Sequence, residues 1–370
     1  MSKNIIINSS FSETRLAILE NDLLAELYIE RNQDMGSVGN IYYGKILRVL
    51  PGMQAAFVDI GMDKAGFLYV NDATETVISY DNKDTKTGSG IGNENSTTDT
   101  AELSMMFDNG PCANIEDLLK QGQNIIVQIQ KDPLGTKGAR VTRHINIPGH
   151  YLVYMPFSKH IGISQRLEDE EERIRLKDIV SAFSIDDDGY IVRTAAEGAN
   201  REELEREANI LRQIWLDIVE RSKQITAPNL LTPDLDLVLR GIRDLFTDEI
   251  TAVYIDSIAV YSSVKQFVSS FHPMGVHRIQ HYQEKAPIFD YFNIEIELER
   301  IFERKIWLKS GGYIVIDQAE ALTAIDINTG RFVGKSNLEE TVTQINIEAA
   351  REIAYQIRLR DIGGIIIIDF

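Results

Sequence analysis

The chain lacks the cysteines and long apolar segments that would place it in a membrane or an oxidising compartment. It has one cysteine, Cys112, which excludes an internal disulfide and a cysteine-rich zinc site within the chain. No apolar run reaches the ~18 residues that a membrane-spanning helix needs. The opening residues, MSKNIII, lack the long apolar core of a signal peptide and the arginines of a transit peptide. We therefore expect a protein of a reducing compartment with no membrane partner.

Basic residues are also scarce, since 38 lysines and arginines face 56 acidic residues and the net charge is -18. Taken alone, this balance argues against nucleic-acid binding, because phosphate contacts need cations. Local clusters can still bind RNA, and Phe57 and Phe67 have Lys45, Arg48 and Lys64 nearby in sequence. Exposed on a small barrel, such aromatic residues would stack on bases while the cations attract phosphates. The alternative is that the phenylalanines belong to a core.

Two short apolar runs near the end of the chain each finish in an aspartate. They are ALTAID, ending at Asp326, and IIIID, ending at Asp369, and a helix-length amphipathic segment separates them. A strand, a crossover helix and a strand form a parallel pair, so both carboxylates would lie at one sheet edge, roughly 5 Å apart. Asn328, two residues after Asp326, would share its face. This pattern predicts a Mg²⁺ site, and the alternative is a pair of turn-forming aspartates.

Other motifs favour structural roles. The loop before the crossover helix ends in Gly334-Lys335-Ser336, but the first glycine of a P-loop is one residue out of place, with Thr329 at the required position. A P-loop nucleotide site is therefore a weaker alternative, and we expect Ser336 to cap the helix. His277 and His281 have i, i+4 spacing but no third zinc ligand in register.

The order of segments predicts several domains. Short glycine-rich strands between residues 38 and 70 suggest a small barrel. Residues 81–111 are rich in Asn, Thr, Ser and Gly and are expected to form a disordered insertion that splits it. A long helix is predicted over 201–224, and Pro228 and Pro233 mark a boundary.

Together these segments resemble the ribonuclease E/G family over nearly the whole chain. The blocks that carry the resemblance are IYYGKI at 41–46, AAFVD at 55–59, GFL at 66–68, IVRTA at 191–195, EALTAIDIN at 320–328 and RLRDIGGIIIIDF at 358–370. The resemblance implies a multidomain α/β fold. Its parts are an RNase H-like subdomain (1–38 and 233–301), an inserted S1-type OB-fold barrel (39–135), a 5′ sensor (136–232) and a DNase I-like catalytic subdomain (302–370).

The resemblance also implies roles for individual residues. Asp326 and Asp369 match the catalytic aspartates that hold Mg²⁺, and Asn328 matches the catalytic asparagine beside them. The 5′-phosphate site would consist of Arg193 and Thr194, lined by Gly149 and Val153, and the RNA-binding positions would be Phe57, Phe67 and Lys137.

The implied activity is a Mg²⁺-dependent endoribonuclease. It would cut single-stranded, A/U-rich RNA with a preference for 5′-monophosphorylated ends, in RNA processing and mRNA decay. A homo-oligomer, a degradosome-like complex and a location in the bacterial cytoplasm or a plastid stroma are expected with it. Because the sequence stops at Phe370, before the family's zinc link, we expect the catalytic subdomain to be incomplete and the zinc link to be absent. The alternative is a non-catalytic RNA-binding fragment of such an enzyme.

Overall fold

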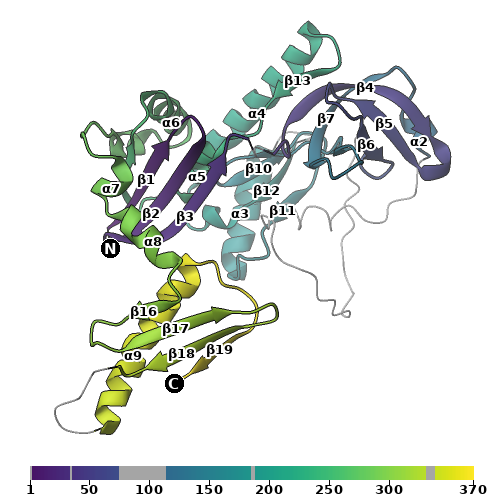
Figure 1. The fold of residues 1–370 in the computed structure, drawn as a ribbon. Coiled ribbons are helices and arrows are strands. Elements are labelled where there is room, and N and C mark those ends of the chain that lie inside the picture. Colours follow the sequence, from purple (N-terminus) through teal and green to yellow (C-terminus); the bar gives the residue numbers. More distant parts are fainter. Residues whose placement is uncertain (1, 34–35, 75–113, 185–187, 331–337) are drawn as a thin grey trace. The chain divides into compact units, whose positions relative to one another are not determined.

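A computed structural model describes residues 2–33, 36–74, 114–184, 188–330 and 338–370 (Figure 1). Backbone contacts divide the chain into two compact units, residues 1–35 with 236–370 and residues 36–235. The expected insertion at 81–111, Cys112 and the predicted helix cap Ser336 lie outside the described residues. Within the described ranges, no helix is both long enough and apolar enough to cross a membrane.

The first unit begins with a five-stranded sheet in the order β15-β14-β1-β2-β3, in which β1, β14 and β15 are parallel and β2 is antiparallel to its neighbours. The strands are β1 (Lys3–Ser9), β2 (Glu13–Glu20), β3 (Leu23–Arg31), β14 (Ile250–Ile255) and β15 (Ile279–His281). The predicted hairpin turn joins β2 to β3, and Asn21 and Asp22 have φ of 51° and 64° there. Two successive positive φ values are what a type I′ turn requires.

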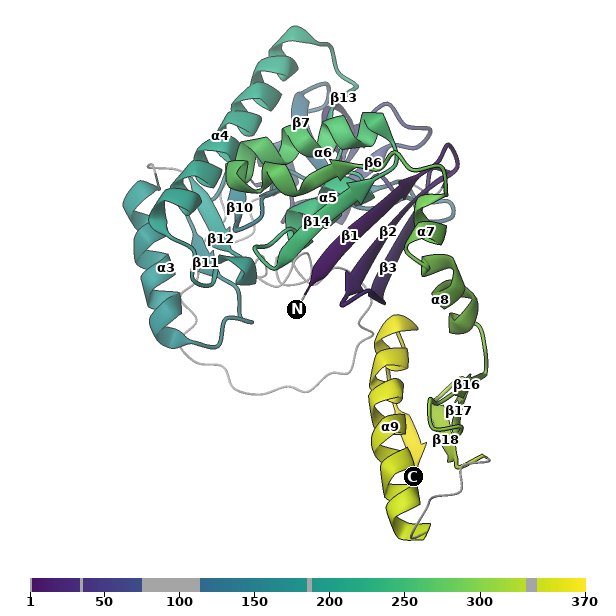
Figure 2. The same cartoon turned by 90° about the vertical axis from the view of Figure 1, so that its left-hand side faces the viewer.

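Helices cover both faces of this sheet, as Figure 2 shows for the side bearing α6. The apolar cluster on one face joins β1, β2 and β14 to α5 (Leu237–Leu245) and α6 (Ile258–Phe271). The cluster on the other face includes α7 (Ile288–Tyr291) and α8 (Ile294–Ile301). The short helix η3 (Pro273–Arg278) precedes β15. Because both faces are covered, β1 reads as a continuous apolar run rather than an alternating one.

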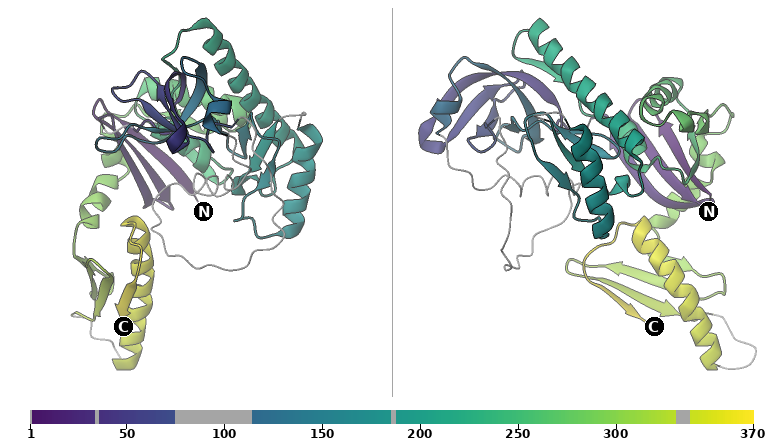
Figure 3. Two further views of the ribbon diagram at one scale, coloured as in Figure 1. Left: turned by 90° about the vertical axis from the view of Figure 1, so that its right-hand side faces the viewer. Right: turned by 180° about the vertical axis from the view of Figure 1, so that it is seen from behind.

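A second, four-stranded sheet closes the chain in the order β16-β17-β18-β19. Its elements are β16 (Lys305–Trp307), β17 (Tyr313–Gln318), β18 (Thr323–Asn328), α9 (Leu338–Leu359) and β19 (Ile366–Asp369). Strands β18 and β19 are parallel and α9 crosses between them, which confirms the predicted strand–helix–strand unit. Helix α9 lies along one face of the sheet (Figure 3, right), where Ile345, Ala349 and Ile353 pack against isoleucines of β17 and β18. The other face of this sheet is not covered by α9.

The second unit contains a closed barrel of five strands, an arrangement consistent with an OB-like fold. They are β4 (Ile41–Leu50), β5 (Ala55–Asp59), β6 (Gly66–Tyr69), β7 (Asn124–Lys131) and β8 (Arg140–Thr142). Their order is β4-β5-β6-β8-β7, and β7 pairs back with β4 to close the ring. The helices η1 (Pro51–Met53) and α2 (Ile115–Leu118) and the strand β13 (Asn229–Thr232), which pairs with β4, accompany the barrel. The glycine-rich strands thus form the small barrel that was predicted.

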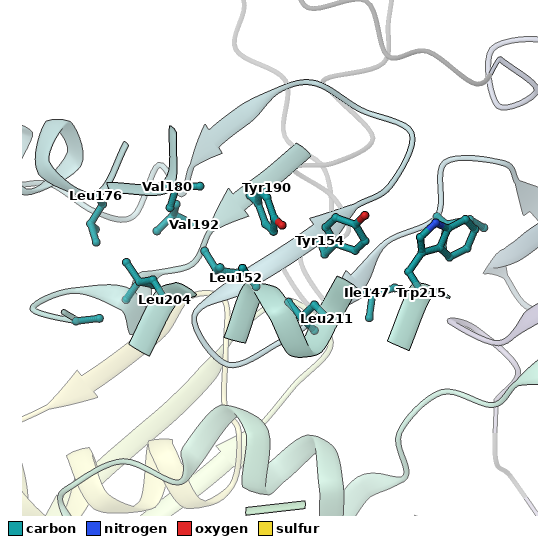
Figure 4. Close-up of a cluster of buried hydrophobic side chains, with 14 of the residues drawn as sticks. Ile147, Leu152, Tyr154, Leu176, Val180, Tyr190, Val192, Leu204, Leu211 and Trp215 are labelled. Carbon is teal, nitrogen blue, oxygen red and sulfur yellow. The ribbon is translucent and has the colours of Figure 1, made fainter. Parts of the chain in front are cut away.

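The rest of the second unit is a small sheet packed on two helices. The elements are β9 (Ile147–Pro148), β10 (Leu152–Met155), β11 (Ile161–Ile163), α3 (Glu170–Phe183), β12 (Gly189–Val192), η2 (Thr194–Ala196) and α4 (Arg201–Gln224). Helix α4 has the predicted bounds, and Asn200 and Glu203 form a capping box at its start. Figure 4 shows the core, in which Leu204, Leu211 and Trp215 of α4 meet apolar residues of α3 and the sheet.

Candidate functional sites

The two predicted carboxylates lie opposite each other on neighbouring strands. Asp326 of β18 and Asp369 of β19 are register partners in the parallel pair. Adjacent strands are about 4.8 Å apart and paired residues point to the same side, so the two side chains are neighbours. Both are exposed, on the face away from α9. The structure therefore has the adjacency that the sequence pattern predicted.

Asn328 completes this group on the same face. Its side-chain Nδ2 donates a hydrogen bond of 2.7 Å to Oδ2 of Asp326. The isoleucines on either side of Asp326 point to the other side of the strand, where Ile325 is buried and Ile327 packs beside it against α9. Burial of these isoleucines fixes the register and hence the direction of the polar side chains. We call Asp326, Asn328 and Asp369 the carboxylate site.

The donors of the carboxylate site are hard oxygen ligands. Among the described residues no group of three or more His, Cys, Asp or Glu side chains could hold a metal ion by itself. Mg²⁺ typically binds through one or two carboxylates together with water and substrate phosphates, so it does not need a complete protein cage. Two exposed carboxylates therefore fit Mg²⁺ better than Zn²⁺, whose protein sites are built mainly from histidine and cysteine.

A second predicted group gathers where β12 ends. The backbone N–H of Arg193 donates to the carbonyl of Tyr151 at 2.8 Å, and its Nη1 donates to the carbonyl of Gly149 at 2.7 Å. Thr194 follows and is exposed, while Val153 is buried in β10 opposite Ile191. The structure thus brings Arg193 and Thr194 beside the segment of Gly149, although Val153 offers them little surface.

Glu207, which was not predicted from the sequence, holds this segment in place. Its carboxylate accepts hydrogen bonds from the backbone N–H groups of His150 and Tyr151, the latter at 2.8 Å. Burial raises the pKa of Glu207 to about 7, although these hydrogen bonds and the charge of Arg193 pull the pKa down. A side chain at position 149 would collide with the carboxylate, which explains the glycine. The missed signal was a glutamate on the apolar face of α4, next to Leu204, Ala208 and Leu211.

The predicted aromatic pair lies on the barrel surface. Phe57 of β5 and Phe67 of β6 are register partners, and their ring centroids are 5.6 Å apart at 71°. Both are half-buried and lie outside the barrel core, which is formed by neighbours such as Ala56, Val58 and Leu68. The alternative of a core role for these phenylalanines is therefore wrong.

Two further residues extend this aromatic surface and were not predicted. Tyr69 lies two residues beyond Phe67 and its ring centroid is 4.5 Å from that of Phe67. The guanidinium of Arg140 lies 5.0 Å from the centroid of Tyr69 and pairs with Asp72 at 2.9 Å. The available signal was the i, i+2 spacing of Phe67 and Tyr69, which places both on one side of a strand.

Lys137 is exposed in the loop before β8. Two residues later, the carbonyl of Ala139 accepts a hydrogen bond of 2.7 Å from the backbone N–H of Phe67. Gly138 lies between them so close to the carbonyl of Ala65 that no side chain would fit. This loop is therefore joined to the strand that carries Phe67, although the side chain of Lys137 extends into solvent.

Comparison with known proteins identifies relatives along the whole chain. The model of the ribonuclease E/G family matches residues 146–370. The chain is 44% identical to Ribonuclease G of Escherichia coli strain K12 over 373 residues, which cover 100% of this chain and 71% of that protein. It is 42% identical to Ribonuclease G of Haemophilus influenzae over 369 residues, covering 99% of the chain and 70% of the relative. Ribonuclease E of the same bacterium is 38% identical over 371 residues, which are 37% of its length.

Proposed function

This chain belongs to the ribonuclease E/G family, and from that premise we propose that it is a Mg²⁺-dependent endoribonuclease acting on single-stranded, A/U-rich RNA. The observation that carries the proposal is the register pairing of Asp326 with Asp369 on an exposed sheet face. Two like charges held side by side favour a bound cation. The relatives' names supply the class of substrate.

In the proposed reaction, Asp326 and Asp369 would hold the Mg²⁺ ion. When bound, Mg²⁺ lowers the pKa of coordinated water and stabilises negative charge on the scissile phosphate. Asn328 restrains Asp326 through its hydrogen bond, so that one carboxylate oxygen is already engaged and the orientation of the group is fixed. The protein's own contribution is thus a preorganised pair of carboxylates on a rigid sheet face.

We extend the proposal to the 5′ end of the RNA. Arg193 and Thr194 would bind a 5′-monophosphate, the guanidinium through its planar fork and the hydroxyl as a further donor. The hydrogen bond from Arg193 to the carbonyl of Gly149 supports this role, because it orients the fork before the ligand arrives. Such a preference suits an enzyme of RNA processing and mRNA decay.

The barrel would hold the RNA strand. Stacking of two successive bases on Phe57 and Phe67 is proposed, with Lys137 attracting a phosphate. The phenylalanines lie on the second and third strands of the barrel, which form the face that OB folds use for oligonucleotides. Phe57 and Phe67 are only half-buried, so part of each ring remains accessible. This supports the proposal, because stacking needs exposed ring faces.

The remaining expectations stay part of the proposal. The sheet β15-β14-β1-β2-β3 would be the RNase H-like subdomain, and β16 to β19 with α9 would belong to the DNase I-like subdomain. A homo-oligomer, a degradosome-like complex and a location in the bacterial cytoplasm or a plastid stroma would accompany the activity.

The direct test is cleavage of an unstructured A/U-rich RNA with Mg²⁺ or with EDTA. Asp326→Asn and Asp369→Asn should each lower the rate about a hundredfold, equivalent to about 2.7 kcal/mol of transition-state stabilisation. Asp317→Asn is the matched control, since Asp317 is an exposed carboxylate of β17 that pairs with Arg304. Cleavage that persists in EDTA or in both variants would refute the proposal, and RNA binding without cleavage would favour a non-catalytic RNA-binding role.

A further inference from the structure

An unexplained aromatic group lies on the sheet face that carries the carboxylate site. Trp307 of β16 is 62% exposed and its ring centroid is 5.2 Å from that of Tyr313 on β17. The ammonium of Lys305 lies 4.1 Å from the centroid of Trp307 and 3.5 Å from that of Tyr313. One cation thus contacts both rings, an arrangement that orders them on the surface.

The strand register places this group beside the carboxylates. Trp307 pairs with Tyr313, which pairs with Asn328, and these residues form one row across the sheet. Lys305 pairs with Val315, which pairs with Asp326, the partner of Asp369, and these form the next row. Rows two residues apart on the same face are separated by about 7 Å. The aromatic group and the carboxylate site are therefore neighbours on one surface.

Packing does not account for the aromatic group. The core under this sheet lies on the opposite face, where Ile306 and Ile314 pack with α9. Trp307 lies between Ile306 and Leu308, which are both buried, so the strand is anchored without the indole. A tryptophan left 62% exposed keeps a large apolar surface in water, which a ligand with a flat aromatic face would cover.

We propose that Trp307, Tyr313 and Lys305 form a binding site for one base of the RNA strand, next to the nucleotide whose phosphate is cleaved. The inference rests on the proposed function, because only a substrate held at Asp326 and Asp369 would bring a base to this position. The rings offer stacking surface, and Lys305 offers a charge that complements the adjoining phosphate. Stacking tolerates every base, so this site would position the strand without reading its sequence.

Tryptophan fluorescence of the unaltered chain provides the first measurement. The chain has two tryptophans, and the other, Trp215, is only 9% exposed in the core of the second unit. Rapid mixing with a short A/U-rich RNA and Mg²⁺ should therefore quench the emission of Trp307 before the RNA is cleaved. The quenching should disappear in Trp307→Phe, which keeps a ring for stacking but removes the reporter.

Cleavage with Mg²⁺ provides the second measurement. Trp307→Ala should raise KM about tenfold, as expected for the loss of one stacked base, while Trp307→Phe should recover most of the loss. Phe11→Ala is the control, because Phe11 is 99% exposed in the same unit and belongs to no site described above. Circular dichroism shows whether Trp307→Ala is folded, and the KM of Tyr313→Leu gives an independent reading if it is not.

The two proposals fail in different ways. An RNA that binds and is cleaved without quenching Trp307, with an unchanged KM in Trp307→Ala, overturns the base site and leaves the nuclease proposal standing. Quenching of Trp307 without any cleavage by the unaltered chain refutes the nuclease proposal, and with it the placement of the base site beside a cleaved phosphate.

Discussion

Replacement of Glu207 by glutamine tests how the segment that carries His150 and Tyr151 is held in place. Burial raises the pKa of Glu207 from 4.5 to about 7. Between these two pH values the folded protein retains a proton that the unfolded chain has lost. The free energy of unfolding from this group therefore falls as pH rises, and a shift of this size corresponds to about 3 kcal/mol. The stabilisation is fully present below pH 4.5 and is lost as pH rises through about 7.

Glu207→Gln removes this pH dependence at a cost. The amide oxygen can accept one of the two backbone N–H groups of His150 and Tyr151, but the amide nitrogen then faces the other donor. An unsatisfied buried donor costs about 1–3 kcal/mol at every pH. We therefore expect the variant to be less stable than the unaltered chain at pH 5. By pH 8, where the unaltered chain must bury a charge, the stability difference should move by about 3 kcal/mol in favour of the variant, which cancels or reverses it.

Urea unfolding at pH 5, 6, 7 and 8 measures both effects. In a Trp307→Phe background the emission reports on Trp215, which lies in the same apolar core as α4. Glu220→Gln is the matched control, because Glu220 is exposed on the same helix. Parallel pH profiles for the unaltered chain and Glu207→Gln would refute the reasoning, since Glu207 would then carry the same charge in the folded and unfolded states.

Two further predictions concern residues that we propose to contact RNA. Arg193→Lys should lower the preference for 5′-monophosphorylated over 5′-hydroxyl RNA about tenfold, because an ammonium cannot form the bidentate fork. Competition between the two RNAs measures this preference, and an unchanged preference contradicts phosphate binding by Arg193. Phe67→Ala should weaken RNA affinity about tenfold, because one stacking contact is lost. Fluorescence anisotropy measures the affinity, and Met53→Ala is the control, because Met53 is 61% exposed beside the barrel. Equal affinities of the two variants would exclude stacking at Phe67.

The carboxylate pair could be predicted because local patterns determine it. Alternation within β18 and β19 places Asp326 and Asp369 on one face, and a single crossover helix makes the strands parallel. No long-range information is needed beyond the hand of that connection. The helix over 201–224 could likewise be predicted from local signals, namely its helical hydrophobic period and the residues that cap its start.

The contacts that pattern reasoning missed join distant parts of the chain. Glu207 lies 56 positions from Tyr151, and a glutamate on an apolar helix face says nothing about which backbone donors it will meet. Closure of the barrel depends on the pairing of β4 with β7, across a segment that lies partly outside the described residues. For Arg193, the pattern of a guanidinium beside the Thr194 hydroxyl at a strand end was a weak signal for a phosphate ligand, and the family resemblance strengthened it. The contact of Arg193 with Gly149 appears only in the fold.

The final sheet separates stability from chemistry by strand alternation. Ile314, Ile316 and Ile325 face α9 and supply the core, whereas the opposite face carries the carboxylate site and the aromatic group. Residues on the α9 face fix the register, and a shift of one residue would exchange the two faces. Substitutions on the outer face can therefore alter RNA handling while the core that positions the carboxylates remains intact. This is why loss of activity in a folded outer-face variant can be attributed to the site rather than to the scaffold.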